Sequence, residues 1–301
     1  MGFYVLDLKL SLVYIYIQLI MIIKSCIFDL GGTIVDRYSF TPLICLHRAF
    51  KGKKINVPIE LIRKDMGLSK EEHIDNLLKD KEIQRQWIHK YRVRPSSDDT
   101  QNLFRDFKIM QERETKLNME VLPHTAKCIQ NLRKHNISIG TTTGFDKEQM
   151  ERIKYLLESQ NMFLDSYVSS TCLNKPGRPE PFMIHENMKR LKLDDPRRII
   201  KIDDTISGIQ EGLNAGCWTV AVCRWSSNMN MNSFKEMDKL DNFNSDNDYS
   251  YNYYQLRNKI NKCRQIMASS GAHYVINTLY ELNNVIDDIN DMRTPIPKNL
   301  N

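Results

Sequence analysis

The fold of this chain is decided by Ile22-Ile23-Lys24-Ser25-Cys26-Ile27-Phe28-Asp29-Leu30-Gly31-Gly32-Thr33. The first part is apolar and β-branched, which predicts a buried strand ending at Asp29, and the glycines predict a tight turn. Such a strand presents Asp29 at the carboxyl edge of a sheet, where open α/β folds bind ligands. A carboxylate there can attack phosphorus and form an aspartyl-phosphate. Taken alone, an aspartate after a strand is more often a turn residue.

Further polar motifs follow in a definite order along the chain. A predicted strand at 137–140 runs into Thr141-Thr142-Thr143-Gly144, and another at 199–202 ends in Asp203-Asp204. Between them, Arg178 precedes Pro179-Glu180-Pro181-Phe182 and a helical pattern. The order of aspartate, threonine, cation and aspartate pair resembles the haloacid dehalogenase superfamily. Several ordered motifs that span most of the chain are far more specific than any one of them.

The composition is that of an ordinary globular protein with one or two domains. The chain has 301 residues, of which 41% are hydrophobic and 27% are charged, and its net charge is +6. Lysines and arginines are scattered rather than gathered in a stripe, so we expect no nucleic-acid partner. The seven cysteines are dispersed without a CxxC pair. This predicts a reducing, cytoplasmic location and argues against a disulfide framework or a zinc site.

Residues 1–20 are expected to be an extension outside the fold. Residues 10–23 are almost continuously apolar, but this run is shorter than the ~20 residues of a membrane span, and no small-residue cleavage site follows it. Because 22–29 is needed as the nucleophile strand, no spacer remains for an anchor. We therefore expect no membrane attachment, with Met1 or Met21 as the start. A signal anchor is the minority interpretation.

The remaining pattern predicts an α/β fold with a doubly wound parallel sheet and an inserted helical cap. Residues 21–40 and 121–301 are expected to form the core, because strands and helices alternate through the second half. Residues 41–120 show helical patterns with little strand signal, which favours a mobile cap over the site. Residues 226–254 are rich in Asn, Asp and Ser without a period, which predicts a flexible insertion. Expected cap helices are 41–51, 58–66, 70–79, 82–91 and 99–117, with Asp98 or Asp99 capping the last.

The resemblance implies a role for each motif residue in phosphoryl transfer. Asp29 is the nucleophile, and Asp204 with the main-chain carbonyl of Gly31 would bind Mg²⁺, which prefers oxygen ligands. The hydroxyl of Thr143 and the amide of Gly144 would bind phosphoryl oxygens.

Arg178 would pair with the same phosphoryl oxygens in bidentate fashion. Lys175 is the alternative, because lysine is the usual cation in the superfamily. The Pro-x-Pro-Phe sequence directly after Arg178 favours the arginine.

Position 31 decides the class of reaction. In phosphatases of the superfamily, an acid stands two residues after the nucleophile and protonates the departing alkoxide. Gly31 cannot donate a proton, and without a general acid an ester leaving group loses a factor of ~10²–10⁴ in rate. A carbon leaving group that departs as an enamine needs no such acid.

The expected cap contains the missing electrophilic group. Met66-Gly67-Leu68-Ser69-Lys70-Glu71-Glu72-His73 resembles the cap motif of the phosphonoacetaldehyde hydrolase (phosphonatase) family. The resemblance implies that Lys70 forms a Schiff base with a substrate aldehyde, that His73 on the same helix face moves protons, and that Met66 contacts the substrate. In isolation, Lys70 would be a solvated lysine at a helix start and His73 a half-buried helix histidine. The hypothesis requires the Lys70 amine to face Asp29.

The chain departs from the family pattern at the metal site. Gly208 stands where the family has a second acid, which supports the Mg²⁺ shell through its waters. Asp203 stands where the family usually has glycine and would compensate in part. Ser39 occupies a position where the family often carries cysteine.

The function expected from the resemblance is Mg²⁺-dependent hydrolysis of phosphonoacetaldehyde to acetaldehyde and phosphate, by a homodimer formed through the cap. Two alternatives stay open. One is a phosphatase of the same superfamily that acts on a small phosphate ester, with Lys70 only contacting the substrate. The other is a catalytically impaired homologue that binds ligand without turnover, which Gly208 would permit.

Overall fold

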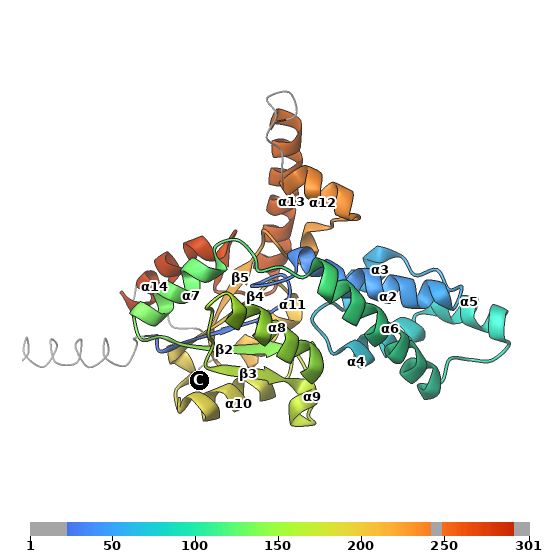
Figure 1. Cartoon of the computed structure of the whole chain (residues 1–301), viewed down its shortest axis with the longest axis horizontal. Helices are drawn as coiled ribbons and strands as arrows, with labels where there is room; N and C mark the ends of the chain where they lie inside the picture. Colours follow the sequence, from blue (N-terminus) through green and yellow to red (C-terminus); the bar gives the residue numbers. More distant parts are fainter. Residues whose placement is uncertain (1–22, 242–248, 292–301) are drawn as a thin grey trace, which may run out of the picture.

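The computed structural model describes residues 23–241 and 249–291, and its centre is a six-stranded parallel sheet (Figure 1). The strands are β1 (Ser25–Phe28), β2 (Ser138–Thr143), β3 (Ser166–Ser169), β4 (Ile199–Asp203), β5 (Trp218–Val222) and β6 (Tyr274–Ile276). Their order in the sheet is β3-β2-β1-β4-β5-β6. The strand that precedes Asp29 is therefore central, with β2 on one side and β4 on the other.

Helices cover both faces of this sheet. Outside residues 40–118 they are α7 (Thr125–Lys134), α8 (Lys147–Ser159), α9 (Ser170–Leu173), α10 (Phe182–Leu191), α11 (Ile206–Asn214), α12 (Phe234–Asp241), α13 (Tyr249–Ser269) and α14 (Leu282–Asn290). Short 3-10 helices are η1 (Arg37–Ser39), η2 (Pro196–Arg198), η3 (Ser227–Met229) and η4 (Leu279–Glu281).

Side chains of β1 alternate between the two faces, as a period of two requires. Cys26 and Phe28 pack with apolar residues of α7, α8 and α14. Ile27 points the other way and packs against Ile184 of α10. This arrangement confirms the α/β fold with a doubly wound parallel sheet.

Residues 40–118, called the cap here, contain five helices that lie together beside the sheet (Figure 1). They are α2 (Phe40–Gly52), α3 (Ile59–Lys64), α4 (Lys70–Lys79), α5 (Lys81–Tyr91) and α6 (Ser97–Asn118). Ser96, rather than Asp98 or Asp99, caps α6. The Ser96 side chain accepts a hydrogen bond from the Asp99 amide, and the Asp99 carboxylate accepts one from the Ser96 amide at 2.9 Å, because the two form a capping box.

The strand before Gly144 is longer than its apolar residues suggest. The expected strand ends at residue 140, whereas β2 continues through Thr143. Thr141 and Thr142 are fully buried within it. Threonine is β-branched and fits a buried strand when its hydroxyl finds a partner, and Thr142 donates to Glu211 Oε2 at 2.9 Å.

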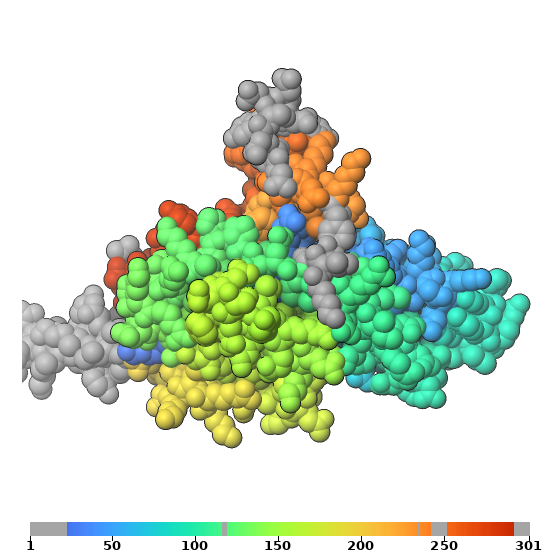
Figure 2. Space-filling view, in the orientation of Figure 1, coloured from blue at the N-terminus to red at the C-terminus, as the bar shows by residue number. Residues whose placement is uncertain are grey.

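Residues 226–254, expected to be a flexible insertion, contain η3, α12 and the start of α13. Figure 2 shows α12 and α13 standing out from the body of the molecule. Met237 and Leu240, three residues apart, are buried, and they give α12 an apolar face that the surrounding polar residues conceal in the sequence. Residues 242–248, the extension at 1–20 and the tail at 293–301 lie outside the described residues.

Two linkers join the cap to the core, the first directly before α2 and the second directly after α6, and they run side by side. The Asp36 amide of the first linker donates to the Glu120 carbonyl of the second at 3.1 Å. The first linker has left-handed backbone at Asp36 (φ 58°), Tyr38 (φ 61°) and Ser39 (φ 47°). Backbone of this kind costs about 1–3 kcal/mol per residue and persists only where its neighbours hold it.

Helix α12 supplies one such restraint through Asp241. Its carboxylate accepts hydrogen bonds from Arg37 (2.8 Å), from the Tyr38 hydroxyl (2.6 Å) and from Arg224 (2.7 Å). Helix α12 is therefore fastened to the first linker. Among the helices of residues 23–241 and 249–291, none combines the length and the apolarity of a membrane span.

Candidate active site

The carboxyl ends of β1, β2 and β4 meet at one edge of the sheet and bring the motif residues together. Asp29 follows β1, Thr143 ends β2, and Asp204 follows β4. Arg178, from the loop before α10, is 2% exposed and donates from Nη2 to Asp29 Oδ1 at 2.7 Å. Lys175, the alternative cation, lies over the Phe182 ring at 4.7 Å and is exposed. The cation beside Asp29 is Arg178.

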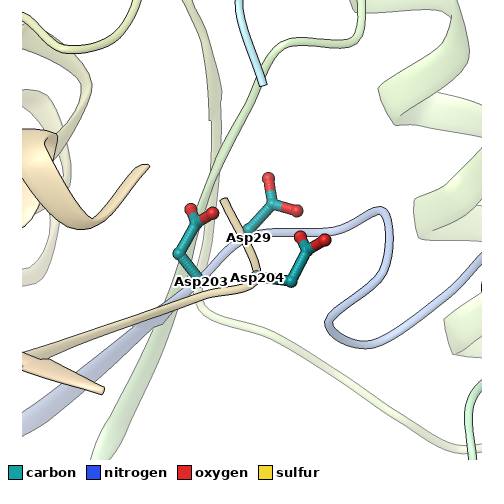
Figure 3. Close-up of side chains that lie close together, drawn as sticks. All are labelled: Asp29, Asp203 and Asp204. Carbon is teal, nitrogen blue, oxygen red and sulfur yellow. The ribbon is translucent and has the colours of Figure 1, made fainter. Parts of the chain in front are cut away.

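Three buried carboxylates form the centre of the site. Oxygen atoms of Asp29, Asp203 and Asp204 lie within 4.8 Å of one another, and in Figure 3 Asp203 and Asp204 flank Asp29. Burial raises the pKa of Asp29 from its ordinary value to about 6. The positive charge of Arg178 opposes this rise, and the negative charge of Asp203 adds to it. Burial, together with the charges of Asp29 and Asp203, raises the pKa of Asp204 well above its usual range. The carboxylates therefore repel one another unless a cation joins them.

The residues around Asp204 suit a small hard cation. Asp204 accepts hydrogen bonds from the Ser227 amide (3.2 Å) and from the Thr33 hydroxyl (3.4 Å). The turn after β1 wraps closely around it: a Cβ on Gly32, where φ is +76°, would lie 2.5 Å from Asp204 Oδ2. The atoms available as metal ligands are all oxygens, and the cluster has an excess of negative charge. Both properties fit a divalent ion such as Mg²⁺.

A buried polar network next to the carboxylates joins Lys201, Glu211 and Thr142, and no motif in the sequence indicates it. Lys201 of β4 is fully buried; its Nζ lies 2.9 Å from Asp203 Oδ2 and 3.5 Å from Glu211 Oε2, and it donates to Thr142 Oγ1 at 2.7 Å. Arg178 Nε also donates to Glu211, at 3.1 Å. The available signal is a lysine inside a strand predicted to be buried, because such a charge requires a partner.

Lys70 reaches this site from the cap. It begins α4, it is only 7% exposed, and it lines a small cavity together with Asp29, Thr143 and Arg178. Burial lowers the pKa of Lys70 to about 8, although the charge of Asp29 acts in the opposite direction. Lys70 is thus a cavity residue beside the nucleophile rather than a solvated lysine.

The other expected residues divide between the cavity and its surroundings. Met66, Gly31 and Gly144 line the cavity. The Thr143 hydroxyl accepts from the Phe145 amide at 3.1 Å, so its own proton can be donated inward. His73 is fully buried one turn beyond Lys70 and does not line the cavity. Burial, and then the Lys70 charge, lower the pKa of His73 well below its ordinary value, so the ring is neutral at pH 7.

A cap loop borders the cavity and fits closely between two parts of the core. Gly67 has φ +97°, and a Cβ there would lie 2.5 Å from Ser207 Oγ and 2.7 Å from Thr205 Oγ1. On the other side, a Cβ on Gly144 would lie 2.8 Å from the Leu68 carbonyl. The volume of the cavity is about 30 Å³, which is room for one or two water molecules. A cleft of about 620 Å³ between cap and core leads outward from Lys70 and Gly144.

Comparison with known proteins first assigns the class. Residues 26–222 match the family model for haloacid dehalogenase-like hydrolases, which is more than half of the chain. The chain belongs to this class of hydrolases.

Similar proteins then narrow the family. A phosphonoacetaldehyde hydrolase from Bacteroides fragilis is 32% identical over 89% of this chain and 97% of that protein. A bifunctional phosphonoacetaldehyde hydrolase/aminoethylphosphonate transaminase from Clostridioides difficile is 31% identical over 88% of this chain, which spans 40% of that longer protein. The crystal structure of a phosphonoacetaldehyde hydrolase-like protein from Oleispira antarctica matches with a TM-score of 0.80 and 27% identity, over 92% of this chain and 96% of that one. Within its class, the chain is a member of the phosphonoacetaldehyde hydrolase family.

Proposed function

We propose that this protein hydrolyses the carbon–phosphorus bond of phosphonoacetaldehyde to give acetaldehyde and phosphate. The observation that carries the proposal is the buried Lys70 amine in the same cavity as Asp29 and Arg178. The names of its relatives support the same reaction. A site that holds an amine, a nucleophilic carboxylate and a guanidinium, with no acid at position 31, suits an aldehyde that carries a phosphonate group.

The amine acts first. Neutral Lys70 attacks the aldehyde carbon, and loss of water leaves an iminium at Nζ. The lowered pKa of Lys70, about 8, favours this step because a larger fraction of the amine is unprotonated near neutral pH. The neutral ring of His73, one turn along α4, contributes to the low charge around the amine.

The carboxylate acts second. Asp29 attacks phosphorus, and the electron pair of the carbon–phosphorus bond moves toward the iminium to form an enamine, so no proton from position 31 is required. Arg178, Thr143 and the Gly144 amide hold the phosphoryl oxygens. Water then hydrolyses the aspartyl-phosphate to phosphate. Protonation of the enamine carbon and hydrolysis of the imine release acetaldehyde and restore Lys70.

The acidic cluster would hold Mg²⁺ through the carboxylates of Asp29 and Asp204 and the carbonyl of Gly31. The ion would supply positive charge that offsets the repulsion between these carboxylates and an anionic substrate. Asp203 is a poorer candidate for a ligand than Asp204, because its Oδ2 already faces the two cations Lys201 and Arg178. The hydrogen bonds that Asp204 accepts come from the neutral groups of Thr33 and Ser227.

Borohydride trapping tests the amine step and gives a pH dependence. Borohydride added with phosphonoacetaldehyde should reduce the imine and leave a stable adduct on Lys70, located by peptide mass spectrometry. Because only the unprotonated amine reacts and the pKa of Lys70 is about 8, the trapping rate should be half-maximal near that pH and level off about one pH unit above it. Turnover without any adduct on Lys70 would contradict the proposal.

A substrate panel separates this reaction from ester hydrolysis. Acetaldehyde release from phosphonoacetaldehyde is compared with phosphate release from small phosphate esters at equal concentration and with Mg²⁺ present. Gly31 cannot protonate an alkoxide, so we expect the esters to react more slowly by a factor of ~10²–10⁴. Faster turnover of an ester would instead identify a phosphatase. Ligand binding without any turnover would identify an impaired homologue.

We also propose a cytoplasmic homodimer formed through the cap. Support for the interface comes from exposed apolar residues on the cap, including Val93 (61% exposed) and Ile109 (66%). Analytical ultracentrifugation measures the assembly, and a monomer at micromolar concentration would contradict the proposal.

Substitution of Gly67 by alanine is expected to weaken activity more than stability. The new Cβ would meet Ser207 and Thr205, so the cap loop cannot close fully over the site. A misplacement of about 1 Å lowers the rate by roughly 10²-fold, whereas the left-handed backbone costs alanine only about 1–2 kcal/mol of unfolding free energy. The measurements are kcat/KM for acetaldehyde release and thermal unfolding.

Gly52→Ala is the matched control, because the Cβ of a residue at the end of α2 would meet open space. We expect this variant to keep both activity and stability. Equal kcat/KM values for the Gly67 variant and this control would show that closure of the loop does not limit the reaction.

A further inference from the structure

Gly208, in the first turn of α11, lies directly beneath the carboxylate of Asp203. A Cβ on Gly208 would lie 1.9 Å from Asp203 Oδ2, 2.0 Å from Cγ and 2.3 Å from Oδ1. These distances are shorter than any non-bonded contact, and the obstacle is the whole carboxylate rather than the end of a flexible chain. The Asp203 side chain therefore fills the space into which any side chain at position 208 would project.

From this position, Asp203 holds two elements of the site. Its Oδ1 accepts hydrogen bonds from the amide (2.9 Å) and the hydroxyl (2.7 Å) of Thr205, which fixes the turn that carries Asp204. Its Oδ2 lies 2.9 Å from Lys201 Nζ and 3.3 Å from Arg178 Nη2. Asp203 is fully buried, so these contacts are shielded from water.

The contact with Arg178 connects Asp203 to the reacting centre. The nitrogen that faces Asp203, Nη2, is the same atom that donates to Asp29 Oδ1 at 2.7 Å and to the Thr142 carbonyl at 2.6 Å. Two carboxylates thus contact this end of the guanidinium. Without Asp203, Lys201 and Arg178 would share only Glu211 and Asp29 as anionic partners. Arg178 would also lose one of the contacts that fix the position of its Nη2 atom.

We propose that Asp203 is a positioning residue for Arg178 and that Gly208 provides the space it requires, so that the two positions act as one unit. The space holds one carboxylate, which can belong to a residue at position 203 or at position 208. An aspartate at position 208 would start from the point that the Asp203 carboxylate now occupies, and it would face the same Lys201 and Arg178. The inference extends the proposed function, but the space shared by the two residues does not depend on it.

A double-mutant cycle tests the shared space. The variants are Asp203→Gly, Gly208→Asp and the two combined, with Gly52→Asp, at a position with open space around it, as the control for adding an aspartate at a glycine. We expect each single change to lower the thermal unfolding midpoint, and Gly208→Asp to do so most because two carboxylates then compete for one space. The combined variant should recover most of the loss. A combined variant that is no more stable than the worse single variant would overturn the proposal.

A second variant separates positioning from shape. Asp203→Asn retains the size of the side chain but removes the charge that faces Arg178. We expect binding of inorganic phosphate in the presence of Mg²⁺, measured by calorimetry, to weaken by roughly 10–100-fold. The combined Asp203→Gly, Gly208→Asp variant should restore it. Unchanged phosphate affinity in Asp203→Asn would overturn the positioning role.

These two measurements use unfolding and phosphate binding, so they remain informative if the wild-type protein releases no acetaldehyde. In that case the proposed function fails, whereas unfolding and phosphate binding still test whether Asp203 and Gly208 act together. Where acetaldehyde is released, Asp203→Asn should lower kcat more than it raises KM, because Arg178 acts most strongly on charge that develops in the transition state.

Discussion

Replacement of Lys70 by methionine is expected to abolish acetaldehyde release from phosphonoacetaldehyde, with a loss of roughly 10⁴-fold or more, as for other residues that form a covalent bond to substrate. Methionine has a similar length and suits the buried position, where Lys70 is 7% exposed, so the fold should be retained. Without the amine, no iminium forms, and the carbon–phosphorus bond has no electron acceptor.

Lys70→Arg is the sharper version of the same experiment. Arginine keeps the positive charge but stays protonated at any usable pH, so it cannot attack a carbonyl carbon. If Lys70 only attracted the phosphonate group by its charge, the arginine variant would retain much of the activity. We therefore expect it to be as inactive as the methionine variant.

The matched control is Lys79→Met, at the other end of α4, where the side chain is 67% exposed and pairs with Asp75. An exposed pair of this kind contributes little to stability, and we expect this variant to behave as the wild type. More than a tenth of wild-type acetaldehyde release in Lys70→Arg would show that the amine is not the electron acceptor.

Replacement of Asp29 by asparagine is expected to remove turnover by roughly 10⁴–10⁶-fold while leaving the amine step intact. Asparagine has the same shape but is not a nucleophile toward phosphorus. The charge of Asp29 raises the pKa of Lys70, so its removal lowers that pKa further and leaves more neutral amine at pH 7. Borohydride trapping on Lys70 should therefore persist in a variant that releases neither phosphate nor acetaldehyde.

The stability of this variant provides an independent check on the electrostatics. Burial raises the pKa of Asp29 to about 6, so at pH 7 the carboxylate is ionised but its charge is less stable in the folded chain than in the unfolded one. In the absence of Mg²⁺, Asp29→Asn should unfold at the same temperature as the wild type or higher. The exposed Asp194→Asn is the control. A marked loss of stability in Asp29→Asn alone would mean that the Arg178 contact outweighs the burial of the charge.

Local patterns were sufficient to predict the central strand and the residues that follow it. The strand before Asp29 is apolar and ends in a glycine turn, and its place beside β2 and β4 brings the three motif ends to one edge. The helix that begins at Lys70 has the expected bounds, because Ser69 caps it and the apolar residues keep helical spacing. These features depend on neighbours in the sequence.

Features that depend on distant partners were not predictable in the same way. Lys201 and Glu211 are ten residues apart in sequence, and only the crossing of α11 over β4 makes them partners. The sequence suggests that Asp203 compensates in part for the acid missing at position 208, but it cannot reveal that the Asp203 carboxylate fills the space next to Gly208. Helix α12 was missed because its apolar residues are few and its stability comes from packing and from the contacts of Asp241.

The Asp241 contacts have a consequence for protein engineering. Its carboxylate contacts Arg37 and Tyr38 in the linker between core and cap, which lies about 200 residues before α12 in the chain. A deletion that removes α12 would therefore also remove a restraint on this linker. A truncation that retains Asp241 keeps these contacts, whereas one that removes it leaves Arg37 and Tyr38 without this carboxylate and the left-handed backbone there with one restraint fewer.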